Sequence, residues 1–318
     1  MLSVSLNGNI NILNSASPSN PHIIQANQVA ITSMCFDQAS ETLYTGSFDG
    51  VVVATDILSG VSTKVKGTHK PNGNYYRGEI HHGKISGLTM CAGSLVSVGW
   101  DDSIRFSTGA QCTAAAPLVG QPCAVACSLG LIVVGTTAEI ALYRGENKVF
   151  ALASLSYAVT CIAVLGEEEI AVGGDDSKTH IYSIAGDSLV EVTTIETRSA
   201  VSAVSYSPVG DAIAIGDNGR QVEVYERGTW TARVKGRWVF HTSKITALAW
   251  SPSGNQLASG SLDESIIIWN CAQPTAKLQY PFAHSGGVSA IQWMADGKLV
   301  SAGNDHTIVF WNIPSEIA

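Results

Sequence analysis

"SGSLDESIIIWN" (Ser259–Asn270) decides the fold, because related copies of it occur along the chain. Asp263 follows the first serine by four residues, and Trp269 comes six residues after the aspartate. His241 lies 18 residues before the serine, so the three residue types of a hydrolase triad occur close together. A catalytic site needs to occur only once, whereas a structural motif can recur.

The pattern of a hydroxyl residue followed four positions later by an aspartate recurs. The copies are "SAGNDHTIVFWN" (Ser301–Asn312, with Asp305, Trp311 and the upstream His284), "SVGWDDSIRFST" (Ser97–Thr108, with Asp101 and the upstream His82) and "TGSFDGVVVATD" (Thr45–Asp56, with Asp49). A weaker copy, "VGGDDSKTHIYS" (Val172–Ser183), keeps the aspartate and has a valine in place of the hydroxyl residue. Recurrence favours a structural role over a catalytic one.

The spacing of the turn aspartates predicts the fold. Asp263 and Asp305 are 42 residues apart, and the 87 residues between Asp176 and Asp263 make two units of similar length. Within a unit, "ITALAW", "QLASGS" and "IIIWN" read as strands separated by short turns. Units of about 40 to 45 residues with four strands are typical of WD-repeat propeller blades. We therefore expect an all-β, seven-bladed WD-repeat β-propeller with four-stranded antiparallel blades.

The chain length suits one closed ring. We expect residues 1–318 to form a single domain, in which 27–318 supply seven units and 1–26 supply N-terminal strands that include the ring-closing strand. The units are expected to start near Ile31, Ile85, Ala124, Val159, Val201, Ile245 and Val288. Closure protects the edges of the sheets, so Pro21–Ala26 is predicted to pair with the third strand of the last blade, near Thr307–Trp311.

The repeated polar residues are interpreted as structural hydrogen-bond chains. In each chain the turn aspartate accepts from the histidine, the histidine bonds to the hydroxyl, and the hydroxyl accepts from the tryptophan indole. The expected members are His241, Ser259, Asp263 and Trp269; His284, Ser301, Asp305 and Trp311; His82, Ser97 and Asp101; and Thr45 and Asp49. No catalytic residue is expected.

Composition and charge argue against several other functions. The net charge of −8 lacks the basic footprint that a nucleic-acid or anionic-membrane surface needs. The sequence contains no membrane span or signal peptide that we can recognise. Its seven cysteines are scattered without zinc-binding spacing, as expected for free thiols in a cytosolic protein. We expect no metal, no cofactor and no small-molecule substrate.

Two features are candidates for partner binding. An insertion at 67–84 carries Tyr75, Tyr76 and Arg77, residue types that are favoured at interfaces. A surface loop without a partner is the alternative. Phe48 and Trp100 directly precede turn aspartates, where large apolar groups are unusual. They either pack against neighbouring loops or contact a partner.

A succession of intact and decayed units points to a known family. "MLSVSLNGNINIL", "YTGSFDGVVVATDILSG", "SVGWDDSIRF", "IAVGGDDSKTHIYSI" and the closing "SAGNDHTIVFWNI" resemble the second half of the actin-interacting protein 1 family, whose members are WD-repeat partners of cofilin. The resemblance implies a non-enzymatic protein of the cytoplasmic actin cytoskeleton that binds actin filaments with cofilin and promotes their disassembly. It also implies the C-terminal propeller of a two-propeller protein, and hence a fragment. A general WD-repeat scaffold for another complex is the alternative, because fold alone does not fix function.

Overall fold

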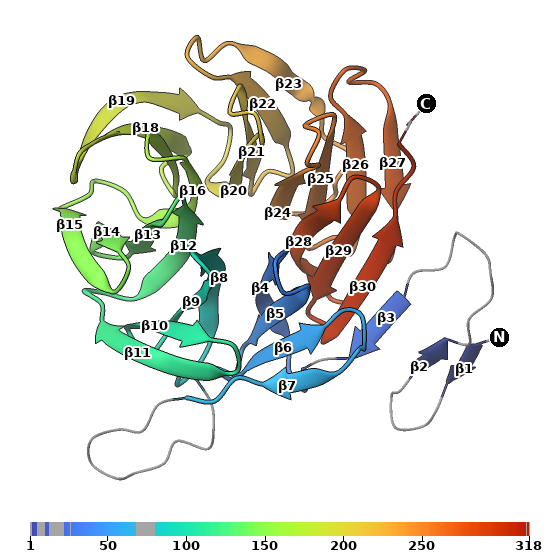
Figure 1. Cartoon of the computed structure of the whole chain (residues 1–318). Helices are drawn as coiled ribbons and strands as arrows, with labels where there is room; N and C mark the ends of the chain where they lie inside the picture. The colour runs from blue at the N-terminus through green and yellow to red at the C-terminus, as the bar shows by residue number, and fades with distance from the viewer. Residues whose placement is uncertain are drawn as a thin grey trace.

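The computed structural model describes residues 2–4, 10–12, 22–25, 27–67, 80–315 and 317. All regular secondary structure in these residues is β-strand, and seven four-stranded antiparallel sheets stand around a central axis (Figure 1). The predicted seven-bladed β-propeller is confirmed. The units begin at or within two residues of the predicted positions, with the third starting at Pro122 rather than Ala124.

The first six blades each take four consecutive strands, which follow one another from the central axis outward. The first three blades are β4 (Ile31–Asp37), β5 (Thr42–Ser47), β6 (Val52–Asp56) and β7 (Ser62–Lys64); β8 (Ile85–Cys91), β9 (Ser94–Gly99), β10 (Ser103–Thr108) and β11 (Gln111–Pro117); and β12 (Pro122–Ser128), β13 (Leu131–Thr136), β14 (Glu139–Arg144) and β15 (Asn147–Ala153). The fourth and fifth are β16 (Val159–Leu165), β17 (Glu169–Gly174), β18 (Lys178–Ala185) and β19 (Ser188–Glu196); and β20 (Val201–Tyr206), β21 (Ala212–Asp217), β22 (Val222–Glu226) and β23 (Ala232–Trp238). The sixth is β24 (Ile245–Trp250), β25 (Gln256–Ser261), β26 (Ile266–Asn270) and β27 (Lys277–Tyr280), and the seventh contains β28 (Val288–Ala295), β29 (Lys298–Gly303) and β30 (Thr307–Asn312).

The seventh blade obtains its outer strand from the N-terminal part of the chain. β3 (His22–Gln25) pairs antiparallel with β30, with Ile23 opposite Val309 and Ile24 opposite Ile308. This pairing confirms the predicted ring closure, in which the two ends of the chain share one sheet. β1 (Leu2–Val4) and β2 (Ile10–Ile12) pair with each other. The assignment of residues 1–318 to a single domain stays a prediction.

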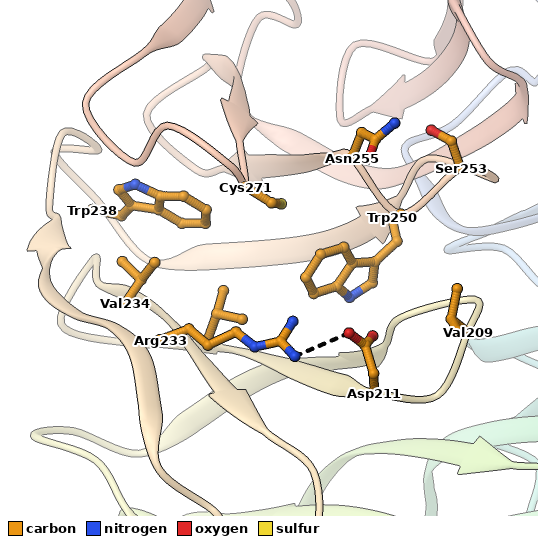
Figure 2. Close-up of a pocket in the computed structure, with 11 residues that line it drawn as sticks. Val209, Asp211, Arg233, Val234, Trp238, Trp250, Ser253, Asn255 and Cys271 are labelled. Atoms are coloured by element: carbon orange, nitrogen blue, oxygen red, sulfur yellow. Dashed lines mark hydrogen bonds and ion pairs between the residues drawn. The ribbon is translucent and has the colours of Figure 1, made fainter.

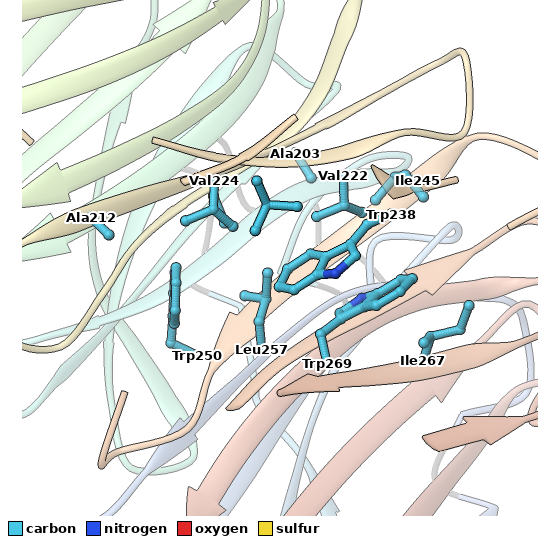
Figure 3. Packing of buried hydrophobic residues seen from close by; sticks show 12 residues of the cluster. Ala203, Ala212, Val222, Val224, Trp238, Ile245, Trp250, Leu257, Ile267 and Trp269 are labelled. Atoms are coloured by element: carbon cyan, nitrogen blue, oxygen red, sulfur yellow. The ribbon is translucent and has the colours of Figure 1, made fainter. Parts of the chain in front are cut away.

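The core lies between neighbouring blades. The middle strands are buried on both faces, as in β25, whose six residues are all buried. This explains why they read as continuous apolar runs rather than alternating ones. Between the fifth and sixth blades, Trp238 stacks on Trp269 with ring centroids 4.7 Å apart (Figure 3). Each aromatic ring fills the space between two sheets, so neighbouring blades stabilise one another.

Hydroxyl groups on the inner strands add polar links between blades. Thr32 Oγ1 is 2.6 Å from the carbonyl oxygen of Ile85, at the start of the next inner strand. Thr246 Oγ1 makes the equivalent contact with the carbonyl of Val288 at 2.6 Å. All seven inner strands contact their two neighbours in the ring. The ring is thus held by packing at every blade boundary and by hydrogen bonds at some of them.

Candidate interaction surface

The sequence-predicted residues gather at one end of the ring. The second strand of each blade is antiparallel to the first, so the turn after the second strand lies beside the loop that enters the first. The turn carries the aspartate, and the entering loop carries the histidine. We call this end the turn face.

In the sixth blade, four side chains form a continuous chain of hydrogen bonds. His241 Nδ1 lies 3.0 Å from Asp263 Oδ2, and its Nε2 lies 2.8 Å from Ser259 Oγ. The indole Nε1–H of Trp269 donates to the same hydroxyl oxygen over 2.8 Å. His241 is 1% exposed, and Ser259 and Trp269 are fully buried. A nucleophilic serine has to meet its substrate, whereas this hydroxyl is sealed inside the blade and bonded on two sides.

The seventh blade repeats this geometry. His284 lies 3.0 Å from Asp305 through Nδ1 and 2.7 Å from Ser301 Oγ through Nε2. Trp311 Nε1–H donates to Ser301 Oγ over 2.8 Å. Thr307 adds a hydroxyl that donates to the aspartate over 2.8 Å. Two blades therefore carry the complete chain, each linking the entering loop, the turn and the third strand.

In the second blade the histidine is His81, and the prediction of His82 was wrong. His81 Nε2 is 2.8 Å from Ser97 Oγ, and its Nδ1 is 2.7 Å from Asp101 Oδ1. The backbone N–H of His82 donates to Asp101 over 3.2 Å, whereas the ring of His81 makes the two side-chain bonds. The histidines of the sixth and seventh blades lie four residues before β24 and β28, and His81 stands at that distance from β8. Register against the inner strand decides which of two adjacent histidines points into the blade.

In the first blade an asparagine occupies the position of the histidine. The Thr45 hydroxyl donates to Asn27 Oδ1 over 2.8 Å, and both residues are buried. Asp49 instead accepts from Ser47 Oγ at 2.5 Å, so the two predicted residues take part in separate hydrogen bonds rather than one chain. The sequence analysis missed Asn27, although its place four residues before β4 was the available signal.

The fourth blade replaces the chain with aromatic residues that the sequence analysis also missed. Tyr157 and Tyr182 share a hydrogen bond between their hydroxyls at 2.8 Å. The ring of His180 stacks on Tyr157 with centroids 3.7 Å apart. His180 bonds to Glu191 at 2.7 Å and to Asp176 at 3.2 Å. In this blade, where a valine stands at the hydroxyl position, the tyrosine pair links the entering loop to the third strand.

The hydrogen bonds set the charge state of the turn aspartates. Burial by itself would raise the pKa of Asp263, but hydrogen bonds from His241 and Ser265 outweigh it and hold the pKa well below its usual range. The pKa of Asp101 is lowered against burial in the same way by His81. These carboxylates stay ionised at neutral pH and are committed to internal donors.

Phe48 and Trp100 meet on the turn face. Their ring centroids are 6.1 Å apart in an edge-to-face arrangement. Phe48 nevertheless remains 52% exposed and Trp100 46% exposed. The two rings therefore pack against each other and still leave about half of their area to solvent. Tyr75, Tyr76 and Arg77 lie outside the described residues.

A pocket of about 190 Å³ lies between the fifth and sixth blades (Figure 2). Trp238 and Trp250 form apolar walls, and the Arg233 guanidinium is 3.0 Å from the Asp211 carboxylate. Those two charges neutralise each other, so the pocket offers no unpaired charged group from this pair. The described part of the chain has no group of three residues placed to hold a metal ion. It also contains no helix that could span a membrane.

Comparison with known proteins supports the repeat assignment. The family described as "WD domain, G-beta repeat" matches residues 19–54, 234–270 and 275–312. These segments include the last two blades, where the hydrogen-bond chains are complete. The segment 19–54 covers most of the first three strands of the first blade, whereas the second, third and fourth blades lie outside the matched segments.

Several relatives align along nearly the whole chain. It is 32% identical to the "66 kDa stress protein" of Physarum polycephalum over 98% of this chain and 51% of that protein. It is 30% identical to "Actin-interacting protein 1" of Caenorhabditis elegans, over 99% of this chain and 51% of that protein. "WD repeat-containing protein 1-B" of Xenopus laevis is also 30% identical, over 98% of this chain and 52% of its own length.

The chain spans about half the length of the curated relatives it matches. The predicted resemblance is confirmed by relatives that carry the name actin-interacting protein 1 in a nematode, an insect and a plant. The chain is thus a seven-bladed WD-repeat β-propeller that resembles, along nearly its entire length, half of a protein of the actin-interacting protein 1 family.

Proposed function

We propose that this chain is a non-enzymatic interaction module of the actin cytoskeleton, which binds actin filaments together with cofilin and promotes their disassembly. One observation carries the proposal: an alignment over about 98% of the chain with proteins named for their interaction with actin. In this proposal the chain corresponds to the C-terminal propeller of a two-propeller protein. It acts in the cytoplasm, without a cofactor, nucleic acid or membrane.

The hydrogen-bond chains support a scaffold rather than an enzyme. The serine and histidine of the sixth and seventh blades are at most 1% exposed, so no substrate can reach them. The apolar side chains that do reach solvent on the turn face, such as Phe48 and Trp100, suit contact with another protein.

Cosedimentation with actin filaments tests the proposal. The chain should pellet with filaments, and cofilin should increase both the pelleted fraction and the release of actin into the supernatant. Each assay needs filaments alone and cofilin alone as references. Failure to pellet under either condition, with the protein folded by circular dichroism, would contradict the proposal.

A general WD-repeat scaffold is the second candidate function. The matched repeat family is common to propellers of many functions, and the chain spans only half of its relatives. Capture of a defined complex without actin or cofilin, combined with a negative cosedimentation result, would favour this candidate.

A further inference from the structure

Seven equivalent backbone contacts encircle the mouth of the central channel on the turn face. The donor in each blade is the backbone N–H of the residue before the turn aspartate, or of the equivalent residue where the aspartate is missing. The acceptor is the carbonyl of the residue just before the first, innermost strand of the same blade. The donor and acceptor pairs, at 2.9 to 3.1 Å, are Phe48 and Ala30, Trp100 and Lys84, Thr137 and Gln121, Asp175 and Ala158, Asn218 and Ala200, Leu262 and Lys244, and Asn304 and Gly287. The backbone thus fixes two side-chain positions per blade around the channel.

The side chains at these positions are unevenly distributed. The large apolar ones are Phe48, Trp100 and Leu262, which are 52%, 46% and 43% exposed. They belong to blades 1, 2 and 6, and the two lysines, Lys84 and Lys244, belong to blades 2 and 6. Blades 6, 7, 1 and 2 are consecutive in the ring. We call these five residues the basic-apolar arc.

The opposite side of the mouth is different in character. The turn positions of blades 3, 4 and 5 hold Thr137, Asp175 and Asn218. Asp175 accepts a hydrogen bond from the backbone N–H of Ala158 at 2.8 Å. At these turn positions, large apolar side chains therefore occur in blades 1, 2 and 6, and polar or acidic ones in blades 3, 4 and 5.

The two lysines have no carboxylate partner in the described part of the chain. The ion pairs found there use other cations. The Lys84 ammonium instead lies over the Trp100 ring, 5.2 Å from its centroid. Burial, and then the positive charge of Lys244, lower the pKa of Lys84.

The aspartates next to the lysines are already committed. Asp101 binds His81 and Arg105, at 2.7 and 2.9 Å. Asp263 binds His241 at 3.0 Å. In a chain whose net charge is −8, two lysines without a carboxylate partner among the described residues are a specific local feature of the turn face. Carboxylates of a partner protein would offset the positive charge of these two lysines.

We propose that the basic-apolar arc binds an acidic segment of a partner protein that also presents an exposed apolar side chain. The partner's carboxylates would lie at Lys84 and Lys244, and its apolar side chain would cover Phe48 and Trp100. Half-exposed aromatic rings beside cations are typical of binding centres, because they combine apolar contact with charge recognition. This proposal goes beyond the proposed function, since it specifies the chemistry of a ligand without requiring actin.

Selection from a display library of random short peptides tests the proposal without actin or cofilin. Peptides selected on the protein should be enriched in aspartate and glutamate next to leucine or an aromatic residue. Binding of a selected peptide, followed by fluorescence anisotropy, should weaken as salt is raised. The double variant Lys84→Glu with Lys244→Glu should weaken it about tenfold or more. Trp100→Ser should also weaken peptide binding, but the affinity should fall with rising salt as steeply as in the unchanged protein.

The matched control is Lys64→Glu, which makes the same charge change on the exposed outer strand β7. It should leave peptide binding unchanged. The proposal would be overturned if basic peptides were enriched or if no peptides were enriched. It would also be overturned if the double lysine variant bound the selected peptide as tightly as the unchanged protein. A further outcome would also overturn the proposal: no peptide is enriched, but the protein binds phosphatidylserine vesicles and the double lysine variant loses that binding. The arc would then be a membrane-binding surface. If acidic peptides were enriched but the chain did not pellet with actin filaments, only the proposed actin function would be rejected.

Discussion

At the scale of single residues, a hydroxyl buried between a histidine and an indole is the feature that most resembles catalysis. Ser259 Oγ lies 2.8 Å from both His241 Nε2 and Trp269 Nε1. In a fully buried position, each polar atom needs a partner, since an unsatisfied one costs about 1–3 kcal/mol. The hydroxyl is needed because it satisfies two neighbours at once.

The first prediction concerns that hydroxyl. Ser259→Ala should lower the free energy of unfolding by about 1–2 kcal/mol, because the histidine and the indole each lose a partner. Urea unfolding followed by tryptophan fluorescence measures the change. Ser285→Ala, at an exposed loop position, is the control and should have little effect. Ester or peptide hydrolysis that disappears in Ser259→Ala would contradict the structural role.

The second prediction concerns pH and Asp263. Its folded-state pKa lies below that of the unfolded chain, about 3.9, so its ionised form contributes stability at neutral pH that is lost as the pH falls below about 4. Asp263→Asn should therefore lower stability at neutral pH and flatten the decline in acid. Urea midpoints measured across acidic and neutral pH give the test, with the exposed Asp102→Asn as the reference. An unchanged pH profile in Asp263→Asn would count against the linkage.

At the scale of the structural element, the tight turn after the second strand contains one residue in the left-handed region in six of the seven blades. In the first blade this is Gly50, with φ of +84°, and its carbonyl accepts from the N–H of His81 at 3.1 Å. A Cβ on Gly50 would lie 2.0 Å from the His81 carbonyl oxygen. Asp102 occupies the same position in the second blade with φ of 53°. The need for glycine is thus local to the first blade and arises from the neighbouring loop.

The third prediction follows from this contact. Gly50→Ala should destabilise the protein by about 1–3 kcal/mol, since both the backbone conformation and the clash oppose it. It should also disturb the loop that carries His81. Asp102→Ala is the matched control, because that position already holds a Cβ, and it should change the thermal midpoint little. Equal midpoints for the two variants would show that the loop adjusts without cost.

At the scale of the whole molecule, the ring closes by joining distant parts of the chain in one sheet. β3 covers the edge of β30 over four residue pairs, from His22 with Phe310 to Gln25 with Thr307. Without β3, the backbone groups of β30 that face it would lose their partners and offer an edge to another chain. The shared blade therefore couples the stability of the ring to residues before the first complete unit.

The fourth prediction concerns this closure. Deletion of residues 1–26 should lower the thermal midpoint and increase light scattering on heating, because it exposes the edge of β30. Deletion of residues 1–14 keeps β3 and should have the milder effect. The same midpoint and scattering for the full chain and the longer deletion would refute the closing role of β3.

The sequence by itself determined the repeat, the blade count and the closing strand. Asp263 and Asp305 lie one unit apart, and the same strand pattern recurs in each unit, because every blade must bury equivalent faces against its neighbours. The complete chains at Ser259 and Ser301 could be assigned because all four residue types were present at matching spacing. A periodic constraint of this kind is written along the chain, so it can be read there.

Only the tertiary structure decided which side chains meet. It selected His81 over His82, because the direction of a side chain depends on register against an inner strand whose first residue the sequence places only approximately. It brought Asn27 to Thr45, and it placed the ring of Phe48 beside that of Trp100 although they are 52 residues apart. These contacts arise from closing the ring, which brings together loops from different blades, and no local pattern in the sequence records that proximity.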